Sequence, residues 1–250
     1  MADDAILTAS GLTKRFGALV VLNNVDFVIG TGEAIGIVGP NGAGKTTLLN
    51  VLSGAYSPSG GHVSFRGHDV TALGSAERCR LGIARSHQIP RPFAGMTVFE
   101  NLHVAASIGG GQTGDAAYQR CVESLELCGM MTVANRRAET LGLLDRKRLE
   151  MARALATGPA VLLLDEIGGG LTDAEAAVLV TTIKSIVARG VSVVWIEHIV
   201  HVLLQVVTRL VCMDAGKILA DGDPEAVMSD PAVVDAYLGP GSGHGAGVAA

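Results

Sequence analysis

The segment "GPNGAGKTT" at residues 39–47 decides how the rest of the sequence is interpreted. It contains the pattern Gly-x4-Gly-Lys-Thr, preceded by the short apolar run "EAIGIV" and followed by "TLLNVL", which has helical spacing. A strand, a glycine-rich turn and a helix in this order form the loop whose backbone N–H groups surround phosphates. Chance alone would produce the pattern in roughly one chain in a hundred at typical residue frequencies. We therefore predict a true phosphate-binding loop.

Each residue type in this loop has a chemical reason to be there. Glycines permit positive φ and let backbone N–H groups approach phosphate oxygens closely. Lys45 is expected to bridge the β and γ phosphates of a nucleoside triphosphate, and the Thr46 hydroxyl to ligate Mg²⁺. The predicted ATP-binding residues of the loop are Gly39, Pro40, Asn41, Gly42, Ala43, Gly44, Lys45, Thr46 and Thr47.

Two further strand ends carry polar residues suited to phosphate chemistry. "VLLLDE" places Asp165 and Glu166 after a buried strand, and "VVWIEH" ends in His198. The carboxyl ends of parallel strands meet at the sheet edge where the phosphate loop lies. We expect Asp165 to contact Mg²⁺ through its outer coordination sphere, Glu166 to act as general base for the attacking water, and His198 to face the γ-phosphate. Its neighbour Glu197 is expected to face away or to be structural.

Composition limits the remaining functions. Of 250 residues 48% are hydrophobic, enough for a large core, and the net charge is −5. With one Trp, three Tyr and five Phe, a base-stacking surface is not expected, so a nucleic-acid partner would need a local basic patch. The four cysteines have no CxxC spacing, the acidic start lacks a signal-peptide layout, and no apolar run reaches the roughly 18 residues of a spanning helix. We expect a cytoplasmic protein.

The order of apolar patterns predicts the fold class. Residues 6–30 alternate apolar and polar positions around a Gly17-Ala18 turn, whereas buried strands at 33–39, 160–166 and 191–198 alternate with helices. This indicates an α/β P-loop NTPase fold: a mostly parallel sheet, an N-terminal antiparallel β-subdomain and an inserted α-helical subdomain at about 90–157. The domain is expected to span 6–240, with "IGGGQTGD" (108–115) a flexible loop and 241–250 a disordered tail.

Together these motifs resemble the ATP-binding subunit of an ABC transporter over about residues 6–240. The resemblance implies that Phe16 in "KRFGA" stacks on adenine, and that Gln88 in "ARSHQIPRPF" reaches the metal and senses the membrane partner. Asp173 in "GGGLTD" occupies the D-loop. "RSHQIPRPFAGMTVFENL", "KRLEMARAL" and "VVDAYLG" are most similar to the branched-chain amino-acid importers, a pattern shared by related importers of urea or short amides.

The family signature, Leu-Ser-x-Gly-Gln, is altered here. Aligned on "KRLEMARAL", this chain has Leu141, Gly142, Leu143, Leu144 and Asp145. In the family this segment contacts the ATP held by the opposite subunit. Losing a hydroxyl donor to a charged acceptor costs about 1.5–3 kcal/mol, and Leu144 adds a Cβ where backbone approaches. We expect a heterodimer with a second ATPase subunit and one weak site; the alternative is a tolerated variant with normal function.

The implied activity is ATP hydrolysis, with Mg²⁺, that drives uptake of branched-chain amino acids or related small polar solutes. The implied partners are membrane-spanning permease subunits, the second ATPase and, indirectly, a solute-binding protein, with the chain held peripherally on the inner face of the cell membrane. Alternatives are the ATPase of a lipopolysaccharide-type exporter and a non-transport ABC ATPase. A binding-only regulator is disfavoured because Lys45, Glu166 and His198 are all present.

Overall fold

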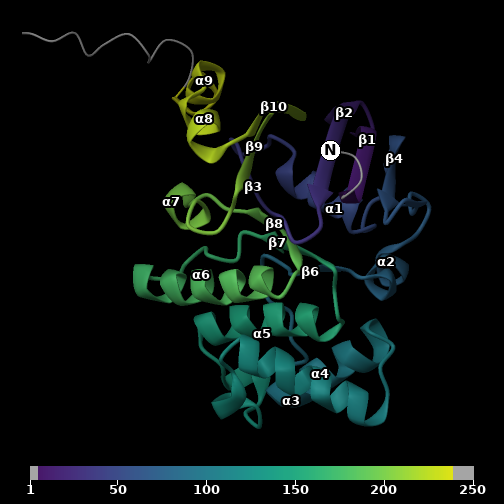
Figure 1. Cartoon of the computed structure of the whole chain (residues 1–250), viewed down its shortest axis with the longest axis vertical. Helices are drawn as coiled ribbons and strands as arrows, with labels where there is room; N and C mark the ends of the chain where they lie inside the picture. The colour runs from purple at the N-terminus through teal and green to yellow at the C-terminus, as the bar shows by residue number, and fades with distance from the viewer. Residues whose placement is uncertain (1–4, 239–250) are drawn as a thin grey trace, which may run out of the picture.

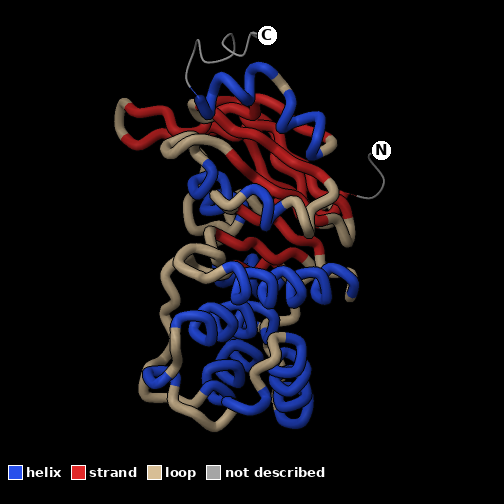
Figure 2. The backbone as a smooth tube through the Cα atoms, turned by 90° about the vertical axis from the view of Figure 1, so that its left-hand side faces the viewer, coloured by secondary structure: helices blue, strands red, loops and turns tan. Residues whose placement is uncertain are grey.

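Two β-sheets form the frame of the protein in the computed structural model, which describes residues 5–238 (Figure 1). Figure 2 shows the strands gathered in one half of the molecule and a group of helices in the other. The predicted tail 241–250 lies outside the described residues. Loops that leave the larger sheet carry most of the candidate site.

The first sheet is the antiparallel N-terminal unit. β1 (Ala5–Phe16) and β2 (Leu19–Gly30) form the expected hairpin, and β4 (Gly60–Phe65) and β5 (His68–Asp69) extend it in the order β2-β1-β4-β5. Alternate side chains such as Leu7, Ala9 and Leu12 are buried, as the period of a half-buried strand requires. The hairpin prediction is confirmed.

The strands that are followed by the predicted catalytic residues belong to the second sheet. Its order is β10-β9-β3-β8-β7-β6, parallel from β9 to β6, with β10 antiparallel at one edge. Every residue of β3, β7 and β8 is buried, which explains why these strands are continuous apolar runs. The α/β fold with a mostly parallel sheet is confirmed. The strands are β3 (Ala34–Val38), β6 (Ile83–Arg85), β7 (Val161–Asp165), β8 (Ser192–Ile196), β9 (Arg209–Asp214) and β10 (Lys217–Gly222).

Helices cover this sheet and continue beyond it. α1 (Lys45–Leu52) follows the phosphate loop, α6 (Asp173–Ala188) follows β7, and α2 (Ser75–Leu81) precedes β6. In Figure 1, α3, α4 and α5 lie together at the end away from the sheets. We propose that they belong to an inserted subdomain over about 90–157. They are α3 (Val98–Val104), α4 (Gly114–Leu127) and α5 (Leu143–Ala156).

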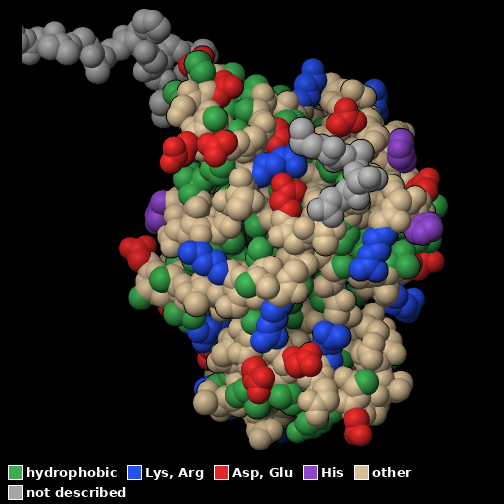
Figure 3. Space-filling view, viewed as in Figure 1, with side chains coloured by type: hydrophobic (Ala, Val, Ile, Leu, Met, Phe, Trp, Pro, Cys, Tyr) green, Lys and Arg blue, Asp and Glu red, His purple; other side chains and the backbone are tan. Residues whose placement is uncertain are grey.

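Several short elements differ from the sequence expectation. The loop expected at 108–115 is shorter, because a π-helical turn (Ala105–Gly109) extends α3 and α4 already begins at Gly114. β6 and α2 have no clear periodic signal over so few residues. The last helices are α7 (Val200–Leu203), α8 (Pro224–Ser229) and α9 (Pro231–Leu238). On the face drawn in Figure 3, basic and acidic side chains are interspersed.

Candidate active site

The phosphate loop joins β3 to α1 and is packed against neighbouring backbone. Gly39 has φ 139°, and a Cβ there would lie 2.0 Å from the Met213 carbonyl oxygen. Gly44 has φ 101°, and a Cβ there would lie 2.8 Å from the carbonyl oxygen of Val21. Both positions therefore require glycine, for close approach as well as for positive φ.

The start of α1 fits a phosphate group. Gly44 is the N-cap and has no side chain to accept from the helix, and the first turn within this described segment carries no acidic residue. The first-turn N–H groups of Lys45, Thr46 and Thr47 have no acceptor inside the helix. The helix dipole adds a positive potential at this end. The loop is therefore built to receive an anion.

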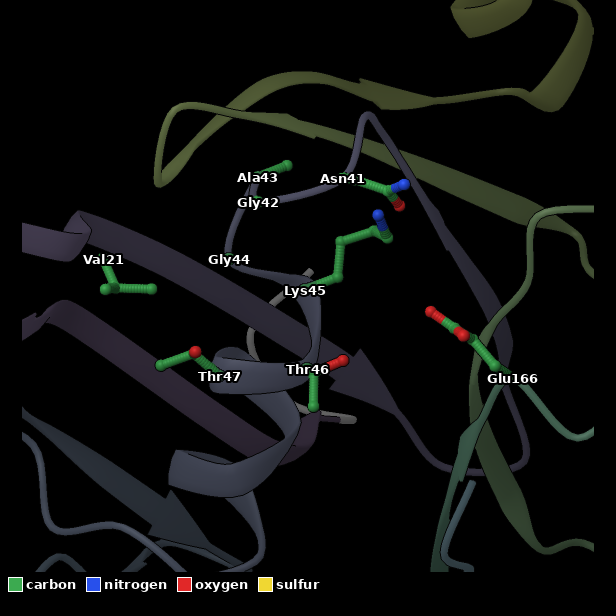
Figure 4. Close-up of a pocket in the computed structure, with 9 residues that line it drawn as sticks. All are labelled: Val21, Asn41, Gly42, Ala43, Gly44, Lys45, Thr46, Thr47 and Glu166. Atoms are coloured by element: carbon green, nitrogen blue, oxygen red, sulfur yellow. The ribbon is translucent and has the colours of Figure 1, made fainter. Parts of the chain in front are cut away.

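A pocket at this point gathers most of the predicted residues of the phosphate loop, together with Glu166 (Figure 4). Val21 was not predicted: it lies on β2 and reaches the pocket through tertiary packing, which no sequence pattern indicates. Gly39 and Pro40 lie at the base of the loop, outside the lining. The pocket is lined by Val21, Asn41, Gly42, Ala43, Gly44, Lys45, Thr46, Thr47 and Glu166.

Lys45 is the buried cation of the pocket, with 5% of its surface exposed. Its ammonium donates to the carbonyl oxygens of Gly39 at 2.7 Å and Pro40 at 2.9 Å. Burial lowers the pKa of Lys45, although the nearby charges of Glu166 and Asp165 act to raise it. Phosphate oxygens would supply this ammonium with charged acceptors, which form stronger hydrogen bonds than neutral carbonyls.

Asp165 is held at the end of β7, with 1% of its surface exposed. The Thr46 hydroxyl donates to its Oδ1 at 3.3 Å, and Arg85 Nη2 donates to its Oδ2 at 2.7 Å. Arg85 also donates to the side-chain oxygen of Asn50. Arg85 was not predicted, because the three-residue strand β6 that carries it has no clear signal in the sequence. The structure thus brings the two expected metal-site residues Thr46 and Asp165 together.

Glu166 is bonded at both carboxylate oxygens by the other two predicted catalytic residues. The side-chain amide of Gln88 donates to Oε2, and His198 Nε2 lies 2.8 Å from Oε1. Since an ionised carboxylate only accepts, this contact requires the proton of the imidazole on Nε2. The backbone of Glu166 has φ 49°, an unusual value for a residue with a side chain. The three residues come from loops after β6, β7 and β8.

Phe16 lies apart from the pocket, at the tip of the β1–β2 hairpin. It is 45% exposed, its ring packs edge-on against Tyr56 at 5.4 Å between centroids, and the Lys14 ammonium lies 5.0 Å from its centroid. Phe16 is not among the residues that line the pocket. Its proposed role on adenine remains a prediction.

The signature-position residues lie at the start of α5 and outside the pocket. Leu141 is buried, Gly142 is the exposed N-cap, and Leu143 is 48% exposed. The Asp145 carboxylate is 3.4 Å from the Arg148 guanidinium, which partly compensates its charge. Asp173, the predicted D-loop residue, is exposed in the first turn of α6. Residues that contact ATP held by another subunit must be accessible at the surface, as Gly142, Leu143 and Asp173 are.

Metal binding in this pocket would depend on few protein ligands. Among the described residues, no group of three or more His, Cys, Asp or Glu side chains could hold a metal ion. Mg²⁺ usually binds through one or two protein groups together with substrate phosphates and water. Thr46, Asp165 and Gln88 fit that requirement. In the same described part of the chain, every helix is too short or too polar to cross a membrane.

Comparisons with known proteins match the segments that carry these motifs. Residues 22–168 match the ABC transporter family, and residues 217–239 match the C-terminal family described as branched-chain amino acid ATP-binding cassette transporter. The high-affinity branched-chain amino acid transport ATP-binding proteins LivG of Escherichia coli (strain K12) and BraF of Pseudomonas aeruginosa are each 35% identical, over 94% of this chain and 98% of theirs.

Solved structures agree with these relatives. A nucleotide-free ATP-binding cassette from an ABC transporter superposes with a TM-score of 0.86 at 30% identity, and so does a cassette in its ADP conformation. Each comparison covers 94% of this chain and 99% of the other. The chain has a phosphate loop, a sheet edge that holds the expected carboxylates, and relatives that it matches along nearly their whole length. It is therefore an ATP-binding subunit of the ABC transporter family.

Proposed function

We propose that this chain binds Mg-ATP at its phosphate loop and hydrolyses it with Glu166 as general base. The observation that supports this best is the position of Glu166, which lines the same pocket as Lys45 and Thr46 and whose carboxylate contacts Gln88 and His198. A carboxylate at the edge of a phosphate pocket is placed to accept a proton from an attacking water. Membership of the family implies the same class of reaction.

The phosphates would be held by groups that are already in place. The first-turn N–H groups of α1 and the Lys45 ammonium supply positive potential where negative charge develops. Mg²⁺, when bound, would neutralise phosphate charge and orient the terminal phosphoryl group. Thr46 and Asp165 would hold that ion, and Arg85 holds the Asp165 carboxylate in place through the 2.7 Å ion pair.

The two contacts on Glu166 have separate proposed roles. Each carboxylate oxygen of Glu166 carries one of these contacts, and opening of either contact would free an acceptor site for the attacking water. Gln88 comes from the loop after β6 that leads into the helical subdomain, so movement of that subdomain would release or restore its contact. His198 would then orient the terminal phosphate and the water.

The transported solutes are proposed from the relatives. LivG and BraF are named as high-affinity branched-chain amino acid transport proteins, and the C-terminal match points to the same group. We propose uptake of branched-chain amino acids or related small polar solutes, through membrane-spanning permease subunits and, indirectly, a solute-binding protein. The chain would then lie on the inner face of the membrane. The altered residues 141–145 further suggest a heterodimer with a second ATPase subunit.

A calorimetric titration with Mg-ATP tests the binding half of this function. Lys45→Ala should weaken ATP binding by about 10- to 100-fold, since a charged hydrogen bond to phosphate contributes about 1.5–3 kcal/mol. Lys184→Ala, on the exposed face of α6, serves as the matched control and should leave the dissociation constant unchanged. Equal affinities of the wild-type chain and Lys45→Ala would refute the assignment of this pocket.

A further inference from the structure

The peptide unit between Ile167 and Gly168 lies one residue beyond Glu166 and is hydrogen-bonded at both polar ends. Its carbonyl oxygen accepts from the Lys147 ammonium at 2.8 Å, and its N–H donates to Glu197 Oε1 at 2.5 Å. In a trans peptide the C=O and N–H point in opposite directions within one plane. The two side chains therefore hold this peptide plane from opposite sides.

Both side chains are buried in places where charge is costly. Lys147 is 5% exposed and Glu197 is 2% exposed. Burial raises the pKa of Glu197, and hydrogen bonds from Gly168 and Trp195 and the charge of Lys147 oppose that rise. Burial likewise lowers the pKa of Lys147, and the charge of Glu197 opposes it. A hydrophobic pair of similar volume would fill this space at less cost, so packing alone does not account for the two groups.

The close approach of Glu197 also explains the residue that follows Ile167. A Cβ on Gly168 would lie 2.8 Å from Glu197 Oε1 and 3.2 Å from its carboxyl carbon. The indole N–H of Trp195 donates to the same oxygen at 3.2 Å and fixes the carboxylate from the strand β8 side. Glu197, Trp195 and Gly168 therefore form a closely fitted arrangement.

Glu166, one residue before this peptide unit, needs such support. Glu166 has φ 49°, which is unfavourable for a residue with a Cβ and persists only when its surroundings hold it. Its own N–H donates to the Ile196 carbonyl oxygen at 2.9 Å, so β8 holds its backbone on one side. The clamped peptide holds the backbone on the other side. Together these contacts limit the directions in which the Glu166 carboxylate points.

We propose that Lys147 and Glu197 are positioning residues that clamp the Ile167–Gly168 peptide and so orient Glu166 for hydrolysis. This inference rests on the proposed function of Glu166. Neither residue touches the reacting atoms; each acts through the peptide. Lys147 lies on α5, two residues after Asp145, and Glu197 directly precedes His198. The clamp therefore links the signature-position segment to the base, and a displacement of α5 would reach Glu166 through one hydrogen bond and the backbone of Ile167.

The kinetic test uses the full chain in single-turnover hydrolysis, with ATP affinity measured in parallel. Glu197→Leu and Lys147→Met each remove one side of the clamp and should slow hydrolysis about tenfold, the effect expected for a slightly misplaced base. Glu197→Gln keeps an oxygen that accepts from Gly168 and should recover most of the rate. ATP affinity should stay unchanged, because these variants leave the phosphate loop intact.

Glu33→Gln is the matched control. Glu33 is another carboxylate that accepts a backbone N–H, from Gly30 at 2.7 Å, but it precedes β3 at the end opposite the phosphate loop. Its replacement should alter neither rate nor affinity. An unchanged rate in both clamp variants, or a loss of ATP affinity as large as the loss of rate, would overturn the proposal.

Amide exchange of Gly168, followed by NMR, tests the clamp without any hydrolysis. Glu197→Leu should speed this exchange at least about tenfold relative to the wild-type chain, because the N–H loses its acceptor. Exchange as slow as in the wild type would overturn the clamp. If Glu197→Leu does not fold, Glu197→Ala replaces it in the exchange test and Lys147→Met carries the kinetic test. If Glu166→Gln hydrolyses ATP normally, the proposed base is wrong, whereas Gly168 exchange still decides whether the clamp exists.

Discussion

The phosphate loop and the signature-position segment differ in what surrounds them. A Cβ on Gly39 would lie 2.0 Å from a carbonyl oxygen of the same chain, whereas a Cβ on Gly142 meets nothing within 4 Å among the described residues. The loop is thus fixed by its own fold. Residues 142–145, at the exposed start of α5, are constrained by this chain only weakly. Substitutions at such an exposed surface affect chiefly the contact with a partner. This is the physical reason for proposing a heterodimer.

The largest expected effect in this comparison is that of Gly39→Ala. The added Cβ clashes with Met213 backbone, and φ 139° is strained for alanine, so unfolding free energy should fall by about 3 kcal/mol or more. Urea denaturation of both proteins measures it. A loss below about 1 kcal/mol, within the ordinary range for a tolerant site, would contradict the tight packing described for the loop.

A smaller effect is expected when the signature is restored. In the complex with the second ATPase, Gly142→Ser with Leu144→Gly should strengthen ATP binding to the partner's phosphate loop by about 10- to 100-fold, because a hydroxyl donor to phosphate is regained. Leu143→Ala, at the position that the family pattern leaves free, is the control. Unchanged affinity would favour the tolerated variant over a weakened site.

The smallest effect belongs to Gly142→Ala in the isolated chain. Gly142 has φ −69°, which alanine adopts readily, and its Cβ would project into open space. The unfolding free energy should change by about 0.5 kcal/mol or less in thermal or urea denaturation. A loss as large as that of Gly39→Ala would remove the difference between the two regions.

The sequence predicted those parts of the site that lie at strand ends. Lys45, Asp165, Glu166 and His198 could be placed because parallel strands end at one edge of the sheet. The structure also brings Gln88, which was predicted from the family resemblance, onto Glu166. The α/β fold itself followed from the contrast between alternating and continuous apolar runs.

Other contacts could not be predicted, because they join segments that are distant in the sequence. Arg85 reaches Asp165 from a three-residue strand that was not predicted. Lys147 and Glu197 meet on one peptide although 50 residues separate them in the sequence. Val21 enters the pocket through the packing of one sheet on the other.

Single-turnover hydrolysis by Glu166→Gln in the assembled complex tests the central claim most directly. The amide cannot accept the proton of water, so hydrolysis should slow by about 10²- to 10⁴-fold, as expected for loss of a general base, while Mg-ATP still binds. Glu175→Gln, whose carboxylate only completes the N-terminal cap of α6, should hydrolyse ATP normally. Hydrolysis by Glu166→Gln at the rate of the unmodified protein would contradict the account.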